Sequence, residues 1–401
     1  AKLGHSYSPD IHKMMEISDF GLKEIAEADI EEFLKVRDFK GINVTIPYKL
    51  TVLPYVDYQD ESVKAIGACN TVVNKEGKLY AYNTDAPGFE ALVLRNGIIV
   101  KDKKVAILGA GGASKTAQYI VKKLGAKEVY VTDTRDIPGC IKNEELPNDI
   151  DVLINTTPCG MYPKNDTIAI DINRFPNLTG VVDVVYNPLK TPLILEAEKR
   201  GIPCRGGLYM LVAQAFYGEQ FFLDKKLDES LIDKVYEALV KDKKNVVLIG
   251  MPTSGKTTVG KELAKALNKQ FVDIDEEIVK KIGMEISEYF KKFGEQSFRD
   301  VETEVIESVA KHPSQIIATG GGSILRQVNV DRLKQNGTLY FLDRPLEKLI
   351  TTSSRPLSSD RDALKKRYEE RYDIYCLVAD IRIKADGSID ESVNAILKEE
   401  K

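Results

Sequence analysis

The stretch Asn245–Lys261, which reads NVVLIGMPTSGKTTVGK, decides the fold of the second half of this chain. A β-branched run is followed by the pattern Gly250-x-x-x-x-Gly255-Lys256-Thr257 and then by a helical pattern. A glycine loop between a strand and a helix lets successive backbone N–H groups face phosphate oxygens, and the helix N-terminus adds the positive end of its dipole. The lysine supplies a charge for the β- and γ-phosphates, and the threonine hydroxyl is a ligand for Mg²⁺. The stretch therefore predicts a P-loop nucleotide site.

A second nucleotide motif lies upstream of this stretch. Lys104–Leu108 is apolar and β-branched, GAGGAS follows from Gly109, and a helical pattern then leads to another strand, Val129–Thr132. This order is typical of a dinucleotide-binding βαβ unit, in which Gly109 permits the tight turn and Gly111 lets a pyrophosphate approach the backbone. A P-loop strand normally opens its domain, but the one at Asn245 follows a long segment that contains this second motif. We therefore predict two proteins joined in one chain. Both halves should be α/β with mostly parallel sheets.

The composition is that of an ordinary globular protein. The 401 residues are 43% hydrophobic and 29% charged, and the net charge is −4. Lysines and arginines are spread through the sequence, which argues against a nucleic-acid partner, and no apolar run approaches the length of a membrane span. The five cysteines show no CxxC pattern, and the three histidines lack metal-ligand spacing. We therefore expect a cytoplasmic protein with reduced thiols and small-molecule ligands, whose protein partners the sequence does not identify.

Three polar clusters stand out in residues 1–85: His5–Pro9, Asn43–Lys49, and Asn70-Thr71 together with Asn83–Asp85. They allow two interpretations. Ser, Thr, Asn and Asp are favoured in caps and turns, so each cluster alone could be structural. Three clusters rich in hydroxyl and amide groups, with one lysine and one aspartate, instead suggest a site for a small polyhydroxylated ligand.

Periodicity and end signals predict the remaining elements. We expect a helix at Pro9–Met15 with Ser8 as its cap, because proline is favoured in the first helical turn. A strand is expected at Gly41–Ile46, ended by Pro47. The charged run Lys241–Lys244 reads equally as a short linker or as a solvated helix end. Further elements are expected at Ile30–Val36, Val152–Asn155, Val181–Val185, Leu193–Lys199, Met210–Phe222 and Glu229–Val240.

The first half of the chain resembles shikimate dehydrogenase, and the second half resembles shikimate kinase. The first resemblance is carried, in the family's order, by HSYSPDIH, GINVTIPYK, GACNTV, YNTDAPGF, GAGGASK, NTTPCGMYP, DVVYNPLKTPL and GGLYMLVAQA. The second is carried by the P-loop, DID, FGEQSFRDVE, a triple glycine, RPL and RYEERYDIY. The resemblance implies a substrate subdomain at 1–85 with 219–240 packing back onto it, a Rossmann-like NADP subdomain at 86–218, a linker at 241–244 and a P-loop kinase domain at 245–401.

The resemblance to shikimate dehydrogenase assigns roles to individual residues. Lys49 and Asp85 would be the catalytic pair, since a lysine beside a carboxylate in a closed cleft can perform general acid/base chemistry. Ser6 and Ser8 would bind the substrate carboxylate. The rest of the substrate would be held by Asn43, Thr45, Asn70, Gln214 and Tyr186. The NADP cofactor would be bound by Gly109, Ala110, Gly111, Gly112, Ala113, Arg135, Thr156, Met161 and Gly207, with Asn155 close to them.

The choice between NADP and NAD depends on residues 132–135, which read TDTR. Arg135 could pair with the 2′-phosphate of NADP, whereas Asp133 would repel that phosphate and favour NAD. The resemblance favours NADP, with Arg135 as the clamp. Three features depart from the family pattern. The family has a strand upstream of the first motif, whereas this sequence begins at AKLGH, and the segment Ser18–Glu31 is short. The segment Arg135–Asp149 leaves little room for the helix that the family has there.

The resemblance to shikimate kinase assigns a second set of roles. Arg299 and Arg371 would clamp the substrate carboxylate, which suits the planar guanidinium fork. Asp275 would grip the ring hydroxyls and accept the attacking proton, and Arg355 would stabilise charge on the moving phosphoryl group. The ATP site would comprise Gly250, Pro252, Thr253, Ser254, Gly255, Lys256, Thr257, Thr258 and Arg355, the Mg²⁺ ligands would be Thr257 and Asp273, and the glycines beside the substrate ring would be Gly320, Gly321 and Gly322.

We therefore expect a bifunctional enzyme of aromatic precursor synthesis. Its first half would reduce 3-dehydroshikimate with NADPH, and its second half would phosphorylate the new 3-hydroxyl with ATP and Mg²⁺. Two alternatives remain open. The chain could be an active kinase that carries a degenerate, non-catalytic dehydrogenase-like module, or its first half could act on quinate or a related cyclitol. The kinase half departs from its family at Thr253, where the loop often has another glycine.

Overall fold

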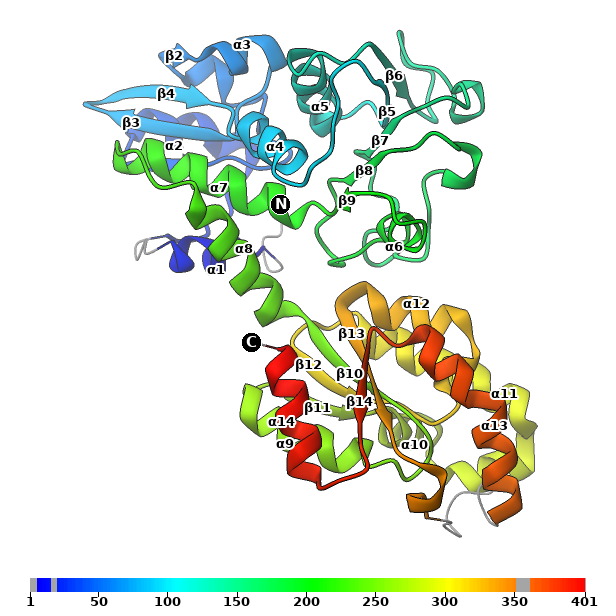
Figure 1. The fold of residues 1–401 in the computed structure, drawn as a ribbon. Coiled ribbons are helices and arrows are strands. Elements are labelled where there is room, and N and C mark those ends of the chain that lie inside the picture. The colour runs from blue at the N-terminus through cyan, green and yellow to red at the C-terminus, as the bar shows by residue number, and fades with distance from the viewer. Residues whose placement is uncertain (1–5, 16–19, 351–360, 401) are drawn as a thin grey trace. The chain divides into compact units, whose positions relative to one another are not determined.

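The computed structural model describes residues 6–15, 20–350 and 361–400 of the chain (Figure 1). The chain divides into two compact units, Ala1–Leu239 and Val240–Lys401. In the described residues, the first unit contains two sheets and the second contains one. Within the same ranges, no helix combines the length and the apolar character that a membrane span requires.

The first sheet of the first unit has the strand order β1-β3-β4-β2. β3 and β4 form an antiparallel hairpin whose turn residues, Glu76 and Gly77, have φ values of +52° and +79°. A two-residue turn can join only antiparallel strands, so this sheet is mixed and not mostly parallel as expected. β1 also pairs antiparallel, whereas β2 pairs parallel with β4. The strands are β1 (Gly41–Asn43), β2 (Tyr58–Gln59), β3 (Thr71–Lys75) and β4 (Lys78–Tyr82).

Two elements near this sheet differ from the prediction. α1 begins at Ser8 itself, with Tyr7 at the N-cap position, and the hydroxyl of Ser6 accepts the N–H of Ser8 at 3.2 Å, so Ser8 is not the cap. β1 ends at Asn43 and not at Ile46, since the chain enters a run of turns once Val44 has donated its N–H to the carbonyl of Asn70. The helices of this part are α1 (Ser8–Met14), α2 (Ile30–Val36), α3 (Glu61–Ile66), α4 (Asp85–Leu94), α7 (Leu208–Leu223) and α8 (Ser230–Lys243).

The second sheet of the first unit is fully parallel, in the order β6-β5-β7-β8-β9. Its core is formed by side chains such as Leu108, Leu153 and Val181, against which α6 packs Leu193 and Ile194. Between β6 and β7, where little room for a helix was predicted, the chain forms only the 3-10 turn Asn143–Glu145. The elements are β5 (Lys104–Leu108), α5 (Gly112–Lys123), β6 (Glu128–Thr132), β7 (Val152–Asn155), β8 (Gly180–Asp183), α6 (Pro192–Lys199) and β9 (Cys204–Arg205).

The segment Lys241–Lys244 is not an extended linker. Helix α8 continues through Lys243, and β10 begins at Asn245, so the two elements are almost directly connected. Lysine has a good helix propensity, and lysines near a helix C-terminus also interact favourably with the dipole. The structure therefore follows the second of the two interpretations of this charged run.

The sheet of the second unit is parallel throughout, in the order β11-β12-β10-β13-β14. All five residues of the central strand β10 are buried. Val246 and Leu248 join a cluster with α9 and α14, whereas Val247 and Ile249 join a cluster with α10, α11 and α13. Successive side chains of a strand point to opposite faces, so the uniformly apolar run predicts helices on both faces, as Figure 1 shows.

Six helices of the described residues accompany this sheet. α11 contains one non-helical residue, Gly294, whose φ of +81° bends the helix. The strands are β10 (Asn245–Ile249), β11 (Gln270–Asp273), β12 (Gln315–Ala318), β13 (Gly337–Asp343) and β14 (Ile381–Lys384). The helices are α9 (Lys256–Leu267), α10 (Ile274–Ile282), α11 (Ile286–Ala310), α12 (Gln327–Asn336), α13 (Arg361–Val378) and α14 (Ile389–Glu399).

Candidate active sites

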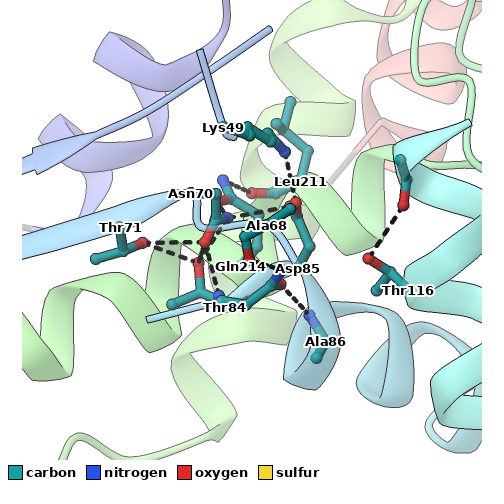
Figure 2. A network of polar contacts seen from close by, with 12 residues as sticks. Lys49, Ala68, Asn70, Thr71, Thr84, Asp85, Ala86, Thr116, Leu211 and Gln214 are labelled. Carbon is teal, nitrogen blue, oxygen red and sulfur yellow. Dashed lines mark hydrogen bonds and ion pairs between the residues drawn. The ribbon is translucent and has the colours of Figure 1, made fainter. Parts of the chain in front are cut away.

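In the first unit, a lysine and an aspartate meet at the start of α4. Lys49 lies in the turn after β1, and its Nζ donates to Oδ2 of Asp85, the first residue of α4, at 2.5 Å (Figure 2). Both side chains are partly exposed, 28% for Lys49 and 17% for Asp85, so a ligand can reach them. A charged pair held together but open on one side is suited to moving a proton to or from a bound ligand.

Amide and hydroxyl groups surround this pair. Nδ2 of Asn70 donates to Asp85 Oδ1 at 3.1 Å, to Thr84 Oγ1 at 2.9 Å and to Gln214 Oε1 at 3.3 Å. Oδ1 of Asn70 accepts the backbone N–H of Thr84 at 2.7 Å, which fixes the direction of the amide. Figure 2 shows these groups converging from both segments of the third polar cluster, residues 70–71 and 83–85, and from α7. This cluster, Lys49 of the second cluster and Gln214 therefore form one network.

The first polar cluster adjoins the same region. Ser6 donates its hydroxyl to that of Ser8 at 3.1 Å, and the ring of the intervening Tyr7 lies edge-on to the ring of Tyr186, with centroids 5.6 Å apart. Asn43, at the end of β1, contacts His12 of α1 at 3.1 Å. The side chains of two predicted residues, Thr45 and Met161, take no part in these contacts. Both side chains are exposed, and the hydrogen bonds that the structure describes for these residues are made by their backbones.

The glycine turn after β5 has the geometry of a phosphate site. Gly109 has a φ of +94°, and Gly111 precedes the first turn of α5. A methyl group added at Gly111 or Gly112 would meet no atom within 4 Å, so this backbone, with Ala110 and Ala113, is open to an approaching group. Thr156 supports the turn from β7, because its hydroxyl donates to the carbonyl of Leu108 at 2.6 Å.

Asp133 and Arg135 form a bidentate ion pair after β6. Nε and Nη2 of Arg135 each lie 2.9 Å from an oxygen of Asp133, which also accepts the N–H of Ala110 at 3.0 Å. The hydrogen bond with the Arg135 guanidinium holds the pKa of the Asp133 carboxyl well below its usual value. The pair neutralises the charge that was expected to repel a 2′-phosphate, and Arg135 remains exposed beside the glycine turn.

Gly207 precedes α7, and Asp183 ends β8; Asp183 was not among the predicted site residues. A methyl group on Gly207 would overlap the carbonyl oxygen of Val184, so only glycine fits there. Asp183 is fully buried and is bound by Asn155, Thr191 and the N–H of Val185. Burial raises the pKa of Asp183 to about 6. The aspartate in DVVYNP, a charged residue inside an apolar strand, was the available signal.

The P-loop of the second unit connects β10 to α9. Gly250 and Gly255 have φ values of +147° and +99°, and Nζ of Lys256 donates to the carbonyls of Gly250 and Met251, both at 2.9 Å. The buried hydroxyl of Ser254 has no hydrogen-bond partner within the described parts of the chain. Pro252 is buried beside Gly321, and Thr258 is exposed on α9. The loop thus presents a buried cation and an unused hydroxyl at the helix N-terminus.

The two predicted Mg²⁺ ligands are in contact. Oγ1 of Thr257 donates to Oδ2 of Asp273 at 2.8 Å, and Oδ1 of Asp273 accepts the N–H of Asp275 at 3.0 Å, which caps α10. The carboxylate ends β11 and the hydroxyl lies in the first turn of α9, and both are hard oxygen ligands of the type that Mg²⁺ prefers. The arrangement fits a Mg²⁺ ion held through one or two protein groups and water.

The triple glycine brings together the three predicted substrate residues of the kinase half. A methyl group on Gly320 would lie 2.9 Å from Oδ1 of Asp275, and one on Gly322 would overlap both terminal nitrogens of Arg299. The carbonyl of Gly321 accepts a hydrogen bond from Arg371 at 3.1 Å. The charged groups from α10, α11 and α13 therefore surround one strand end.

The two arginines carry their charge in a largely buried setting. Burial opposes ionisation of Arg299, but Glu302, at 2.7 Å, and Glu295 outweigh it, and its pKa is raised. Burial lowers the pKa of Arg371, and the like charge of Arg299 adds to this. Two such guanidinium groups favour an anionic ligand between them. Tyr375, which donates to Gly321 at 2.5 Å, was missed, although it follows Arg371 by one helical turn.

Thr253 and Arg355 are the last two residues that the sequence analysis singled out in the kinase half. Thr253 adopts a left-handed conformation with a φ of +65°, in keeping with the glycine expected there, and its hydroxyl contacts the backbone of Ile350. Arg355, predicted to act on the phosphoryl group, lies outside the described residues.

The described residues thus form two candidate sites, a Lys–Asp pair in a unit that also contains a dinucleotide-binding sheet, and paired arginines beside a P-loop. Residues 1–72 match the family model for the shikimate dehydrogenase substrate binding domain, and residues 252–401 match that for shikimate kinase. The chain belongs to the shikimate dehydrogenase family in its first half, which is joined to a shikimate kinase domain.

Individual relatives agree with this assignment. The shikimate dehydrogenase (NADP(+)) of Clostridium perfringens strain 13 is 36% identical over 260 residues, covering 59% of this chain and 95% of that protein. A chorismate mutase/shikimate 5-dehydrogenase fusion from Clostridium acetobutylicum has a TM-score of 0.56 and 33% identity over 59% of this chain and 94% of that one. The shikimate 5-dehydrogenase of Thermus thermophilus, solved with NADP(H) and shikimate, has a TM-score of 0.51 and 27% identity over 59% and 95%.

Proposed function

We propose that this chain reduces 3-dehydroshikimate to shikimate with NADPH and phosphorylates shikimate to shikimate 3-phosphate with ATP and Mg²⁺. The observation that carries the first activity is the contact between Lys49 and Asp85 inside a network of amides and hydroxyls. The second activity is supported by the P-loop and by the glycine triplet that gathers Asp275, Arg299 and Arg371.

In the reduction, Lys49 is the proton donor. NADPH, when bound, supplies the hydride to the carbonyl carbon. Nζ of Lys49 gives a proton to the carbonyl oxygen, and Asp85 orients Nζ from 2.5 Å. Asn70 and Gln214 hold the ring hydroxyls, and Ser6 and Ser8 bind the carboxylate. The open backbone at residues 109–113 would hold the cofactor, together with Arg135, Thr156, Met161 and Gly207.

In the phosphorylation, the P-loop and the arginines hold the two reactants. Lys256 would contact the β- and γ-phosphates, and Thr257 with Asp273 would hold Mg²⁺, which would neutralise phosphate charge. Asp275 accepts the proton of the substrate hydroxyl. The hydroxyl oxygen bonds to the γ-phosphorus as the bond between that phosphorus and ADP breaks. Arg299 and Arg371 clamp the carboxylate. Arg355 is proposed to stabilise the transferred group.

The domain limits proposed for these activities follow the resemblance: 1–85 with 219–240 for the ring acid, 86–218 for NADP and 245–401 for the kinase. A cytoplasmic location is proposed because all five cysteines are free thiols, as expected in a reducing compartment. The partners proposed are small molecules only, the two ring acids and the two nucleotides.

The test uses the purified full chain with NADP and either shikimate or quinate. We expect reduced-nicotinamide absorbance to grow with shikimate, at a kcat/KM clearly above that with quinate. Absence of this signal while the same sample forms ADP from shikimate and ATP would mean that the first half is a non-catalytic module. A higher kcat/KM with quinate than with shikimate would mean that quinate is the preferred substrate of the first half.

A further inference from the structure

A buried histidine connects α7 to the proposed substrate residue Asn43. His12 of α1 and Glu219 of α7 are both fully buried, and Nδ1 of His12 contacts Oε1 of Glu219. The other ring nitrogen, Nε2, lies 3.1 Å from Nδ2 of Asn43. Phe20 stacks on the imidazole with a centroid distance of 3.8 Å, which restricts the ring's rotation. The three polar groups therefore form one fixed chain from Glu219 to Asn43.

The hydrogen-bonding capacities of these groups determine which atom donates and which accepts at each contact. A carboxylate only accepts, so Nδ1 of His12 carries the proton that it donates to Glu219. Nε2 is then the acceptor, and Nδ2 of Asn43 donates to it. This leaves Oδ1 of Asn43, a buried oxygen without a hydrogen-bond partner among the described residues. An unpaired buried acceptor is costly unless a ligand supplies a donor.

The unpaired oxygen lies against one face of α7. A methyl group added to Gly218 of α7 would fit in ordinary contact with Oδ1 of Asn43, at 3.6 Å. Residues four apart lie on the same face of a helix, so Gly218 shares a face with Gln214. Gln214 in turn belongs to the network around Lys49 and Asp85. The unpaired oxygen thus faces the side of α7 that is already proposed to hold the substrate.

We propose that His12 is a positioning residue that selects the substrate through Asn43. By accepting from Nδ2, it turns the carbonyl oxygen of Asn43 toward the ring acid, so that this position of the site requires a hydroxyl donor and disfavours a ketone or ether oxygen. Glu219 fixes the tautomer of His12 that makes this possible. The inference rests on the proposed function of the first half.

A purely structural role would consist of the contact between His12 and Glu219, which joins α1 to α7. Two substitutions separate the roles. In His12→Asn, the amide can take the place of Nδ1 and still reach Glu219, but nothing replaces Nε2. In His12→Gln, the longer side chain can place its oxygen near Nε2 and accept from Asn43. Thus His12→Asn keeps the contact with Glu219, and His12→Gln keeps the contact with Asn43.

The measurement is the set of steady-state constants for shikimate oxidation. We expect His12→Asn to raise the KM for shikimate about tenfold, the effect of one hydrogen bond, and His12→Gln to raise it less than about threefold. The KM for NADP, which reports that the unit is folded, should change less than about twofold in both. If His12→Gln raises the KM for shikimate as much as His12→Asn, the inference is wrong.

A double-mutant cycle provides the second arm. If His12 acts through Asn43, then adding His12→Asn to Asn43→Ala should raise the KM for shikimate by less than about twofold further, because coupled residues are not additive. Full multiplication of the two effects would contradict the proposal. An unsubstituted chain that fails to reduce NADP with shikimate would instead refute the proposed function itself, so the two failures are distinguishable.

Discussion

Thr253 and Ile350 exchange two hydrogen bonds across the kinase unit. Oγ1 of Thr253 donates to the carbonyl of Ile350 and accepts its N–H, each at 3.1 Å. Thr253 is a P-loop residue in a left-handed conformation that favours glycine, which costs on the order of 1 kcal/mol for other residues. The side chain that departs from the family pattern therefore fixes the phosphate loop to the segment that follows β13.

Thr253→Gly should loosen this connection. The backbone strain disappears, but both hydrogen bonds are lost, so we expect little change in stability and a KM for ATP raised about three- to tenfold. Thr253→Ser keeps the hydroxyl and serves as the matched control, with a KM for ATP close to that of the unsubstituted chain. Equal ATP constants for the glycine and serine variants would contradict this role of the contact.

Arg135→Ala should change cofactor preference. Without the arginine, Asp133 is left unpaired and repels the 2′-phosphate, so we expect the KM for NADP to rise about tenfold or more while that for NAD changes less than about twofold. Shikimate oxidation with each cofactor measures both constants, and ADP formation by the kinase half is the internal control. An unchanged ratio of the two Michaelis constants would show that Arg135 is not the clamp.

Asp183 should make the stability of the first unit depend on pH. Its native pKa is about 6, above the value of 3.8 for a free carboxyl. Between these values the native state holds a proton that the unfolded state has lost, so the free energy of unfolding falls as pH rises from about 4 to about 6, by roughly 3 kcal/mol, and then levels off.

The isosteric variant Asp183→Asn tests this. It keeps an acceptor for Asn155 and Val185 but cannot ionise. Urea unfolding followed by circular dichroism at about pH 4.5, 5.5 and 6.5 should show the variant gaining stability relative to the unsubstituted chain as pH rises. A stability difference that is the same at all three pH values would refute the raised pKa.

Gly322→Ala should weaken shikimate binding in the kinase half. The added methyl group would overlap the Arg299 guanidinium and must displace it. We expect the kinase KM for shikimate to rise about tenfold or more, since one charged clamp is lost. Gly283→Ala is the control: it is strained by a φ of +69° but meets no atom within 4 Å. If both alanine variants leave this KM unchanged, Arg299 does not bind the substrate.

The sequence carried most of the fold because its signals are local. The apolar run at β10, followed by a glycine loop and a helix, is specified by neighbouring residues, and so is the βαβ unit at Gly109. The mixed sheet was not predicted, because β1 and β2 pair with strands distant in the sequence, and the turn Glu76-Gly77 lacks the Asn-Gly or Asp-Gly pair that most strongly signals a hairpin.

The sites divide in the same way. The contact between Lys49 and Asp85 was expected only through resemblance, since 36 residues separate them and no spacing rule joins them. The pairing of Asp133 with Arg135 resolves in space what their adjacency left ambiguous, because the two charges bind each other. Asp183 and Tyr375 were missed because their importance lies in burial and in partners that sequence patterns do not reveal.

We propose that two independent chemistries act on the same ring acid within one chain. This proposal is tested most directly by assaying both activities in Lys49→Ala and Lys256→Ala. We expect Lys49→Ala to lower dehydrogenase kcat at least about a hundredfold while the kinase rate stays within about twofold, and Lys256→Ala to show the reverse. Retention of dehydrogenase activity in Lys49→Ala, or of kinase activity in Lys256→Ala, would show that these lysines do not serve the two proposed reactions.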